Sequence, residues 1–247
     1  MIWDSCNGEQ HVQHIQGSLY RLAESQEQIA TRRYVDSLQE QSVLEELLES
    51  SKPVYIDYPH LDYLLRSPFR YPPLEHGSRF GRPHEMSLFY GAENISTTLA
   101  EVAYYRFRFF QDMRTHPKSL LSSEHTIFSV NYDTKLGVQL QNRPFNKYSQ
   151  QLRDPVDYRK TQRLGTDMRN AGVQSFQYES ARDTERGICI GLFSPEPFVN
   201  SKPTEQTTWL CEVNSNTVAF KQSHKSQVII FDIVQFQVNG KLPTPAA

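Results

Sequence analysis

The first fifty residues place apolar side chains at helical spacing in a background rich in glutamine and glutamate. Two such sets follow each other: Val12, Ile15, Leu19 and Leu22, then Val35, Leu38, Val43, Leu44, Leu47 and Leu48. Residues three and four apart share one face of a helix, so the pattern predicts one or two amphipathic helices that end before Pro53. We expect them to pack as a cap on the main domain; a free-standing helix that binds a partner is the alternative.

Residues 53–86 lose this period, because prolines and aromatic side chains crowd them. The prolines include Pro59, Pro68, Pro72, Pro73 and Pro83. We expect a short helix over 61–65, stopped by Pro68, and otherwise irregular chain along the surface. Long irregular segments in compact domains often carry function, and this one contains His76 and Arg79.

The rest of the chain alternates between helical and strand patterns. Helical spacing predicts helices over 96–113 and 154–170, the second opened by Pro155 and closed by Gly172. Alternating or continuous apolar runs predict strands over 87–90, 126–132, 135–141, 175–180, 188–193, 207–213, 217–221 and 227–238. We expect a turn at 133–134 and place the wholly apolar run 188–193 in the middle of the sheet.

Helices come first, strands and helices then alternate, and the end is rich in strands. This order predicts an α+β domain with a mixed or mostly antiparallel sheet. We divide the chain into a helical extension over 1–52, packed on the core, and a main domain over 53–247.

Composition excludes several classes of function. With 247 residues and a formal net charge of −2, the chain has no general attraction to nucleic acid or to an anionic membrane. No apolar run reaches the roughly 18–20 residues of a membrane span, and the first residues lack the pattern of a secretory signal. Three cysteines without ligand-like spacing indicate reduced thiols. We expect a cytoplasmic protein that binds neither nucleic acid nor membrane directly.

The sequence offers no metal or dinucleotide motif. Its eight histidines form no ligand pattern with the cysteines, and the pair His11 and His14 lacks a third ligand, so we predict no metal site. No Walker loop and no Gly-x-Gly-x-x-Gly motif is present.

Four short segments nevertheless carry polar residues in contexts that suit chemistry. Arg79 lies in a loop between two glycines, and Tyr90 ends a short apolar run. Glu101 follows Tyr90 by eleven residues on a predicted helix. Ser180 ends a predicted strand, two residues before Arg182.

Each residue also has an ordinary structural explanation. A loop arginine such as Arg79 often makes a surface ion pair, and Tyr90 would fit a protein core. Glu101 would fit the third position of a capping box that begins at Thr98, and Ser180 would cap a turn. For Arg182 the alternatives are phosphate binding or an ion pair with Glu179 or Asp183, and we give Gln162 a structural role.

Taken in order, the four segments resemble the RES family, which is named for its Arg, Glu and Ser, over about residues 61–193. Its members are mostly toxins of bacterial toxin–antitoxin pairs that act on NAD+, and their fold is similar to that of ADP-ribosyltransferases. The resemblance implies Arg79, Glu101 and Ser180 as catalytic residues. It implies a set of NAD+-binding residues: Arg79, Arg82, Tyr90, Ser180 and Arg182.

One departure concerns the arginine loop. Family members usually carry a glycine directly before the arginine and a Trp-Asn or similar pair after it. This chain has Ser78 before Arg79 and Phe80 after it, with one extra residue before Tyr90. Arg82 is therefore an alternative to Arg79 as the functional arginine.

The implied chemistry is the cleavage of the nicotinamide–ribose bond. A guanidinium suits the diphosphate, and the face of Tyr90 suits the cationic nicotinamide ring. Glu101 would hydrogen-bond the ribose and stabilise an oxocarbenium-like centre. Ser180 would donate to the nicotinamide amide or a ribose hydroxyl, and we do not expect it to be a nucleophile because no Gly-x-Ser-x-Gly elbow surrounds it.

Three functions follow from the resemblance. The first is a toxin that degrades NAD+ by phosphorolysis or hydrolysis, with NAD+ as a consumed substrate and inorganic phosphate or water as the second reactant. The second is a mono-ADP-ribosyltransferase that modifies a protein, although Leu99 replaces the first carboxylate of the Glu-x-Glu pair common in such enzymes. The third is a non-catalytic NAD+-binding module. For a toxin, the resemblance implies an Xre-type helix-turn-helix antitoxin as partner.

Overall fold

The computed structural model describes residues 1–24, 35–53, 58–115 and 120–244. The strands are β1 (Gln13–Glu24), β2 (Phe89–Ala92), β3 (Leu121–Gln139), β4 (Ser175–Glu179), β5 (Ile188–Leu192), β6 (Glu205–Val213), β7 (Thr217–Gln222) and β8 (Val228–Asp232). The α-helices are α1 (Ile2–Ser5), α2 (Leu38–Ser51), α3 (Tyr63–Arg70), α4 (Ile95–Gln111), α5 (Ser149–Leu152) and α6 (Arg159–Asn170). Short 3-10 turns cover Gly8–His11, Phe145–Tyr148 and Ile233–Phe236.

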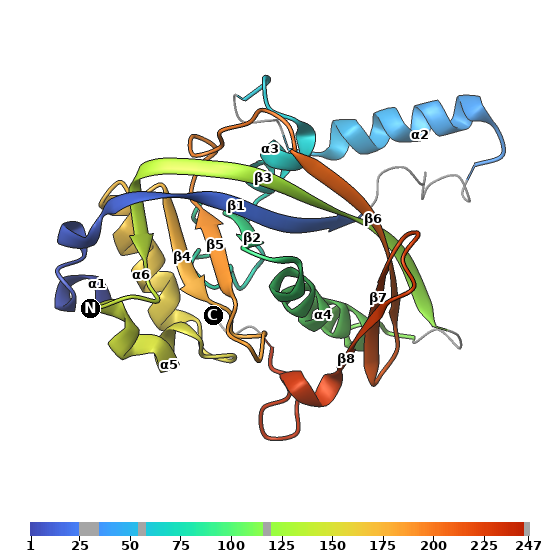
Figure 1. Cartoon of the computed structure of the whole chain (residues 1–247). Coiled ribbons are helices and arrows are strands. Elements are labelled where there is room, and N and C mark those ends of the chain that lie inside the picture. Colours follow the sequence, from blue (N-terminus) through green and yellow to red (C-terminus); the bar gives the residue numbers. More distant parts are fainter. Residues whose placement is uncertain (25–34, 54–57, 116–119, 245–247) are drawn as a thin grey trace.

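Within the described residues, eight strands form one sheet in the order β1-β2-β5-β4-β3-β6-β7-β8, and β1 also pairs with β3. The first five strands in this order therefore close into a ring, and β6, β7 and β8 continue outward from β3 (Figure 1). The β3–β4 pair is parallel, and the other pairs are antiparallel. The predicted α+β class with a mixed sheet is confirmed.

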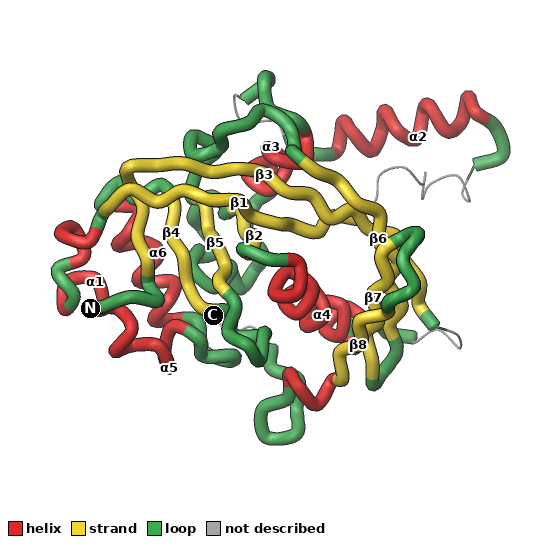
Figure 2. Tube along the Cα trace, viewed as in Figure 1, coloured by secondary structure: helices red, strands yellow, loops and turns green. Residues whose placement is uncertain are grey.

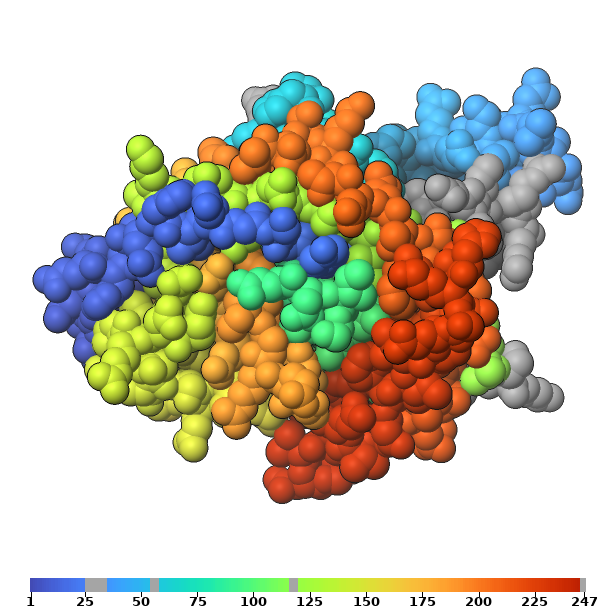
Figure 3. Space-filling view, viewed as in Figure 1, coloured from blue at the N-terminus to red at the C-terminus, as the bar shows by residue number. Residues whose placement is uncertain are grey.

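Helix α4 is the central helix of the molecule. Figure 2 shows it below the long strands β1 and β3, with β2 on one side and β7 and β8 on the other. Its buried face, which includes Leu99, Ala103 and Phe107, packs in one cluster with Trp209 of β6 and Phe220 of β7. In the space-filling view, the green atoms of the β2–α4 region fill the space between β1 and the C-terminal strands (Figure 3). The long predicted helix thus supplies a rigid wall next to the strand ring.

The prediction of a helix over the apolar positions 12–22 was wrong, because this segment forms strand β1. The buried pair Ile15 and Leu19 belongs to one core cluster, and Tyr20 and Leu22 pack against another. A spacing of four residues fits both a helix turn and the period of two of a strand, so the local pattern was ambiguous. Pairing with β3 along most of its length decides in favour of the strand.

The second predicted helix is confirmed as α2, which projects from the body of the molecule (Figure 1). Its side chains Leu38, Val43 and Leu47 are exposed rather than packed as a cap. An ion pair of 2.9 Å between Arg70 of α3 and Glu49 fastens its C-terminal end. The domain boundary at residue 52 stays a prediction, although β1 belongs to the sheet.

Several predicted boundaries also moved. The two strands expected over 126–132 and 135–141 are one strand, β3, and the expected turn at 133–134 lies inside it because Thr134 pairs with Ile15 of β1. Pro68 lies inside α3 instead of ending it. Helix α6 begins at Arg159 and not at Asp154–Pro155 as predicted. Strand β5 is interior, as expected for its continuous apolar run.

Candidate active site

A cavity of about 490 Å³ lies between α4, β1, β2 and the segment 68–88. Its charged lining residues are Arg21, Arg79, Arg82 and Glu101. Its tyrosines are Tyr20, Tyr71, Tyr90, Tyr105, Tyr158 and Tyr178. The volume is that of a small-molecule site. Three guanidinium groups and one carboxylate give the lining a formal charge of +2, which favours an anionic ligand.

Arg79 is held firmly at the edge of this cavity. Its Nη1 donates to the carbonyl oxygens of Leu152 (3.2 Å) and Asp154 (2.8 Å). The guanidinium stacks on the ring of Tyr158, with 4.4 Å from Cζ to the centroid, and is 3.4 Å from the phenol oxygen. Burial by itself would lower the pKa of Arg79, but the neighbouring groups Tyr158 and Glu101 raise it above its usual value. Arg79 is therefore a permanent cation whose side chain also ties the segment 152–158 to the site.

The glycine-flanked loop around Arg79 is packed against α6. Gly77 has φ of +69°, and a Cβ there would come 2.3 Å from the carbonyl oxygen of Gly81. Gly165 of α6 lies so close that a Cβ would approach the carbonyl oxygen of Phe80 to 1.8 Å. Gln162 Nε2 donates to the carbonyl oxygens of residues 76 and 78 at 2.9 and 3.1 Å, so the structural role predicted for Gln162 fits its contacts.

Arg82 and Arg21 are the other two cations of the cavity. Both are half-buried. Neither forms an ion pair within the described part of the chain. The Arg82 guanidinium has no hydrogen-bond partner there either, whereas its backbone N–H donates to Glu85 at 2.9 Å. Of the two arginines of the loop, Arg79 is thus anchored, whereas the Arg82 guanidinium bonds to none of the residues that the structure describes.

Tyr90 connects strand β2 to the arginine loop. Its phenol oxygen accepts a hydrogen bond from the backbone N–H of Phe80 at 3.1 Å and shares one of 2.9 Å with the Ser78 hydroxyl. Burial raises the pKa of Tyr90 to about 12, so the phenol is neutral at physiological pH. Tyr90 lines the cavity, and an aromatic side chain at this place suits contact with a planar ligand.

Glu101 and Ser180 form a short hydrogen bond next to the cavity. The Ser180 hydroxyl donates to Glu101 Oε1 at 2.5 Å, and it accepts the backbone N–H groups of Arg182 at 3.1 Å and Asp183 at 3.0 Å. Ser180 is itself 1% exposed and is not among the lining residues. The serine therefore orients the carboxylate, and Glu101 Oε2 has no hydrogen-bond partner within the described residues.

The position of Glu101 on its helix excludes the capping-box explanation. Helix α4 begins at Ile95, and the side chain of Asn94 caps it by accepting the backbone N–H of Thr97 at 2.8 Å. Glu101 thus lies in the second turn, beyond reach of the cap. Thr97, one turn earlier on the same face, donates to Asp183 at 2.7 Å. Two side-chain bonds one turn apart hold the loop after β4 against α4.

The thiol of Cys189 completes the environment of this carboxylate. Its Sγ is 3.8 Å from Glu101 Oε1, and the residue is 2% exposed. Burial, and next the charge of Glu101, raise the pKa of Cys189 well above its usual value. The Cys189 side chain is therefore a neutral thiol next to the Glu101 carboxylate.

Arg182 lies behind the cavity wall. Its Nη2 donates to the carbonyl oxygen of Pro155 at 2.9 Å and to the phenol oxygen of Tyr158 at 3.0 Å. Its guanidinium covers the ring of Tyr104, with 3.6 Å from Cζ to the centroid. Arg182 is 5% exposed and does not line the cavity. Together with Arg79 it donates to one tyrosine that does.

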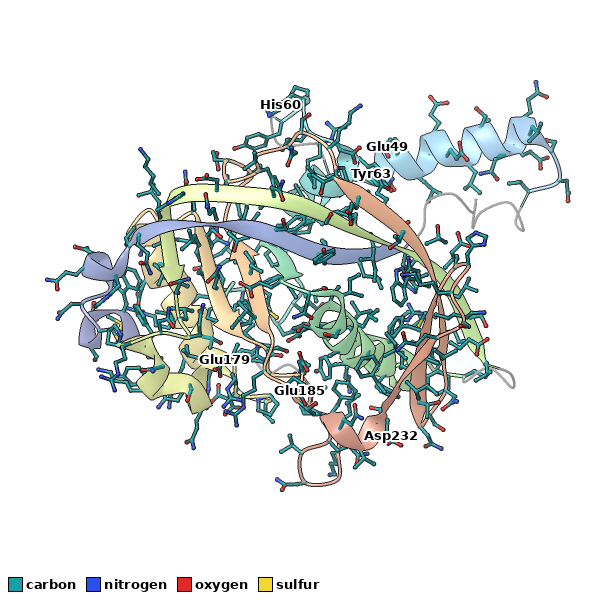
Figure 4. All side chains as sticks on the ribbon, viewed as in Figure 1. Glu49, His60, Tyr63, Glu179, Glu185 and Asp232 are labelled. Atoms are coloured by element: carbon teal, nitrogen blue, oxygen red, sulfur yellow. The ribbon has the colours of Figure 1, made fainter. Side chains whose placement is uncertain are left out.

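The carboxylates considered as partners of Arg182 are engaged elsewhere. Glu179, at the end of β4 in Figure 4, forms an ion pair of 2.9 Å with Arg153. Asp183 accepts from Thr97. The ion pair predicted as an alternative for Arg182 is absent from the described contacts.

The structure thus brings Arg79, Arg82, Tyr90 and Glu101 to one cavity, with Ser180 directly behind. Sequence reasoning missed Arg21 and Tyr158 as lining residues. The sequence did offer a signal for Tyr158, because this aromatic residue follows Pro155 closely, at the start of a predicted helix. Arg21 had none, because its segment was assigned to a helix.

Two further observations concern metal binding and membrane insertion. Across residues 1–24, 35–53, 58–115 and 120–244, no three His, Cys, Asp or Glu side chains are grouped as metal ligands would be. In the same ranges, no helix has both the length and the apolar character needed to cross a bilayer.

Comparisons with known proteins identify a matching family and a similar solved structure. The RES domain family model matches residues 53–214. A search of curated proteins gives no match. Among solved structures, a chain in the crystal structure of the M. tuberculosis MbcT–MbcA toxin–antitoxin complex is similar, with a TM-score of 0.48 and 8% sequence identity over 83% of this chain and 90% of that chain.

Proposed function

The chain belongs to the RES domain family, and from this membership we propose that it is the toxin of a toxin–antitoxin pair and acts by degrading NAD+. The observation that carries the proposal is the pairing of one oriented carboxylate, Glu101, with three arginines in a single cavity. NAD+ has two phosphate charges and one cationic ring, so its anionic half matches the arginines.

We assign the diphosphate to the side of the cavity that holds Arg82 and Arg79. The Arg82 guanidinium has no hydrogen-bond partner among the described residues, which suits direct contact with phosphate oxygens. Arg79 contributes its charge while it holds the segment 152–158 in place. Arg182 acts through Tyr158, which it shares with Arg79.

The nicotinamide end lies in this proposal between Tyr90 and Glu101. The bond from ribose C1′ to the nicotinamide nitrogen breaks, and its electron pair leaves with nicotinamide as a neutral molecule. The sugar becomes oxocarbenium-like, and Glu101 stabilises this positive charge while its free Oε2 accepts a ribose hydroxyl. Ser180 holds Oε1 and so fixes the direction of the carboxylate.

The cleaved sugar is then captured by an oxygen nucleophile. Capture by inorganic phosphate gives ADP-ribose-1″-phosphate, and capture by water gives ADP-ribose and releases one proton. The neutral leaving group needs no general acid, which agrees with the single carboxylate among the lining residues.

A cognate Xre-type antitoxin is part of the proposal. Around the mouth of the cavity, the side chains of Tyr71, Leu74 and Met86 are 43%, 60% and 48% exposed. These residues belong to the segment 66–86, and a protein that covers them would block entry of the substrate.

Expression of the chain from an inducible promoter in a bacterial host tests the proposal. We expect the wild type to deplete cellular NAD+ and stop growth, and Glu101→Gln to do neither. The matched control is Glu46→Gln on the exposed face of α2, which should behave as the wild type. An unchanged NAD+ level on expression of the wild type, or equal NAD+ depletion by folded Glu101→Gln, would overturn the proposal. Transfer of the label from tagged NAD+ to a host protein would instead establish the transferase.

A further inference from the structure

Strand β8 is an open edge of the sheet. It comes last in the strand order, and its partner among the described strands is β7. Figure 1 shows this edge on the opposite side of α4 from the strand ring. The cavity takes its lining from the side of the ring, and none of its lining residues belongs to β6, β7 or β8. The edge is therefore a surface separate from the candidate active site.

The hydrogen-bond pattern shows which backbone groups of β8 face this edge. The backbone N–H of Ile233 donates to the carbonyl oxygen of Asn216 at 2.9 Å, so these two residues form a hydrogen-bonded pair at the end of the β7–β8 ladder. In an antiparallel ladder, such pairs alternate with pairs that exchange no hydrogen bonds. The N–H and C=O groups of Val228 and Ile230, and the N–H of Asp232, therefore point away from β7. Within the described residues, these groups bond to no other element.

The edge lacks the features by which proteins keep exposed edges from pairing. The side chains of Val228 and Ile230 are 49% and 61% exposed, and the strand contains neither lysine nor proline. Its pairing with β7 runs without a bulge. Its charged residue, Asp232, stands at the end of the strand in Figure 4. A regular apolar edge of this kind favours pairing with a further strand.

We propose that β8 pairs in antiparallel orientation with β8 of a second copy of this chain. The backbone groups that face the edge belong to residues two apart and are centred on Ile230. Residues that face each other in this way exchange hydrogen bonds only in one register, with Ile230 opposite Ile230 of the second copy and Val228 opposite its Asp232. The two isoleucines then exchange both of their hydrogen bonds, and each Asp232 N–H donates to the carbonyl oxygen of the opposite Val228. A two-fold axis passes between the isoleucines, as in most homodimers.

The charges on the exposed face of the sheet favour a second copy as the partner. Lys221 of β7 is paired with Val228, so Lys221 and Asp232 of the second copy flank Val228 in one row. Neighbouring strands are about 4.8 Å apart, which places the two Cα atoms about 10 Å apart, within the combined reach of both side chains. Neither residue forms an ion pair among the described residues. Asp232 Oδ1 accepts the N–H of Val234 at 2.9 Å, and Oδ2 faces no such donor there. The two-fold axis forms this ion pair twice.

Sedimentation equilibrium from micromolar to submillimolar concentrations tests the proposal on the full chain. We expect the wild type to pass from monomer to dimer, and Ile230→Lys to raise the dissociation constant at least about 100-fold, because two like charges then lie directly opposite each other. The matched control is Leu210→Lys on β6, an exposed apolar residue that pairs with Lys221 two strands from the edge. It should dimerise as the wild type does. Both variants should turn over NAD+ at the wild-type rate, since neither residue lines the cavity.

Cross-linking tests the register without disturbing the fold. The three native cysteines are buried, so a short bis-maleimide reagent should join two copies of Ile230→Cys, whose Cα atoms are expected about 5.5 Å apart. It should not join two copies of Leu210→Cys, which are separated by five strand spacings, about 24 Å.

Three results would overturn the proposal. They are a wild type that stays monomeric at every concentration, a dimer that Ile230→Lys leaves intact, and equal cross-linking at both positions. Protection of the β8 amides from hydrogen exchange only when a different protein is bound would overturn it in favour of a foreign strand. A dimer that behaves as expected but cleaves no NAD+ would support this inference and contradict the proposed function alone.

Discussion

Replacing Ser180 with alanine removes three hydrogen bonds of the site at once. The hydroxyl donates to Glu101 Oε1 at 2.5 Å and accepts two backbone N–H groups, from Arg182 at 3.1 Å and Asp183 at 3.0 Å. A hydrogen bond to a charged group contributes about 1.5–3 kcal/mol, and each unsatisfied buried N–H costs about 1 kcal/mol or more. We expect the free energy of unfolding to fall by about 3.5–5 kcal/mol, which is less than the about 5–15 kcal/mol of a typical domain.

The same substitution also releases Glu101, the carboxylate that we propose as catalytic. The hydrogen bond from Ser180 to Glu101 contributes about 1.5–3 kcal/mol. If all of this energy stabilises the transition state, its loss lowers kcat/KM for NAD+ by about 10- to 150-fold. Nicotinamide release measures this loss, and urea unfolding at pH 7 measures stability.

Ser175, the first residue of β4, offers a matched control close to Ser180 in the chain. It is fully buried, and its hydroxyl has no hydrogen-bond partner in the described residues. Ser175→Ala should therefore cost neither stability nor more than about twofold in kcat/KM, since an unpaired hydroxyl gives no net stabilisation. In addition, Ser180→Ala should cost less in a Glu101→Gln background than in the wild type. Wild-type activity of Ser180→Ala, or equal losses for both serines, would refute the reasoning.

Three further predictions concern the frame around the site. Burial lowers the pKa of His125 from 6.5 to about 4, so the unfolded chain takes up the proton first and stability falls by up to about 3 kcal/mol as pH drops from 6.5 to 4. In urea unfolding at pH 7 and pH 4.5, His125→Gln should lose less stability than the wild type, and equal losses would contradict this. Gly165→Ala places a Cβ against the carbonyl oxygen of Phe80; we expect a loss of at least about 1–3 kcal/mol and a higher KM for NAD+, and an unchanged KM would show that the arginine loop does not depend on this contact. Thr97→Val removes the 2.7 Å bond to Asp183 and should cost about 1–3 kcal/mol in urea unfolding, whereas a neutral result would mean that α4 does not anchor the loop after β4.

The parts predicted from the sequence are those fixed by local signals. Helix α4 has an amphipathic pattern over many residues, so its bounds were predicted within two residues and Glu101 was placed on it. Strands β4 and β5 were continuous apolar or alternating runs and were predicted within a residue or two. The order of these elements sufficed for the α+β class.

The parts that were missed depend on contacts between distant residues. Strand β1 had a local pattern that fits two periods, and only pairing with β3, more than a hundred residues later, selects the strand. Arg21 could not be assigned to the site while its segment was taken for a helix. The placement of Arg182 behind the cavity depends on the rings of Tyr104 and Tyr158, which lie far from it in the chain. No spacing in the sequence encodes such a contact.

Proton NMR of the purified protein with NAD+, recorded with and without inorganic phosphate, tests the central claim most directly. We predict that nicotinamide forms with the wild type and that Glu101→Gln abolishes its formation. ADP-ribose-1″-phosphate formed only in the presence of phosphate would identify a phosphorylase, and free ADP-ribose would identify a hydrolase. A folded wild-type protein that releases no nicotinamide in either sample would contradict the claim that this cavity cleaves NAD+.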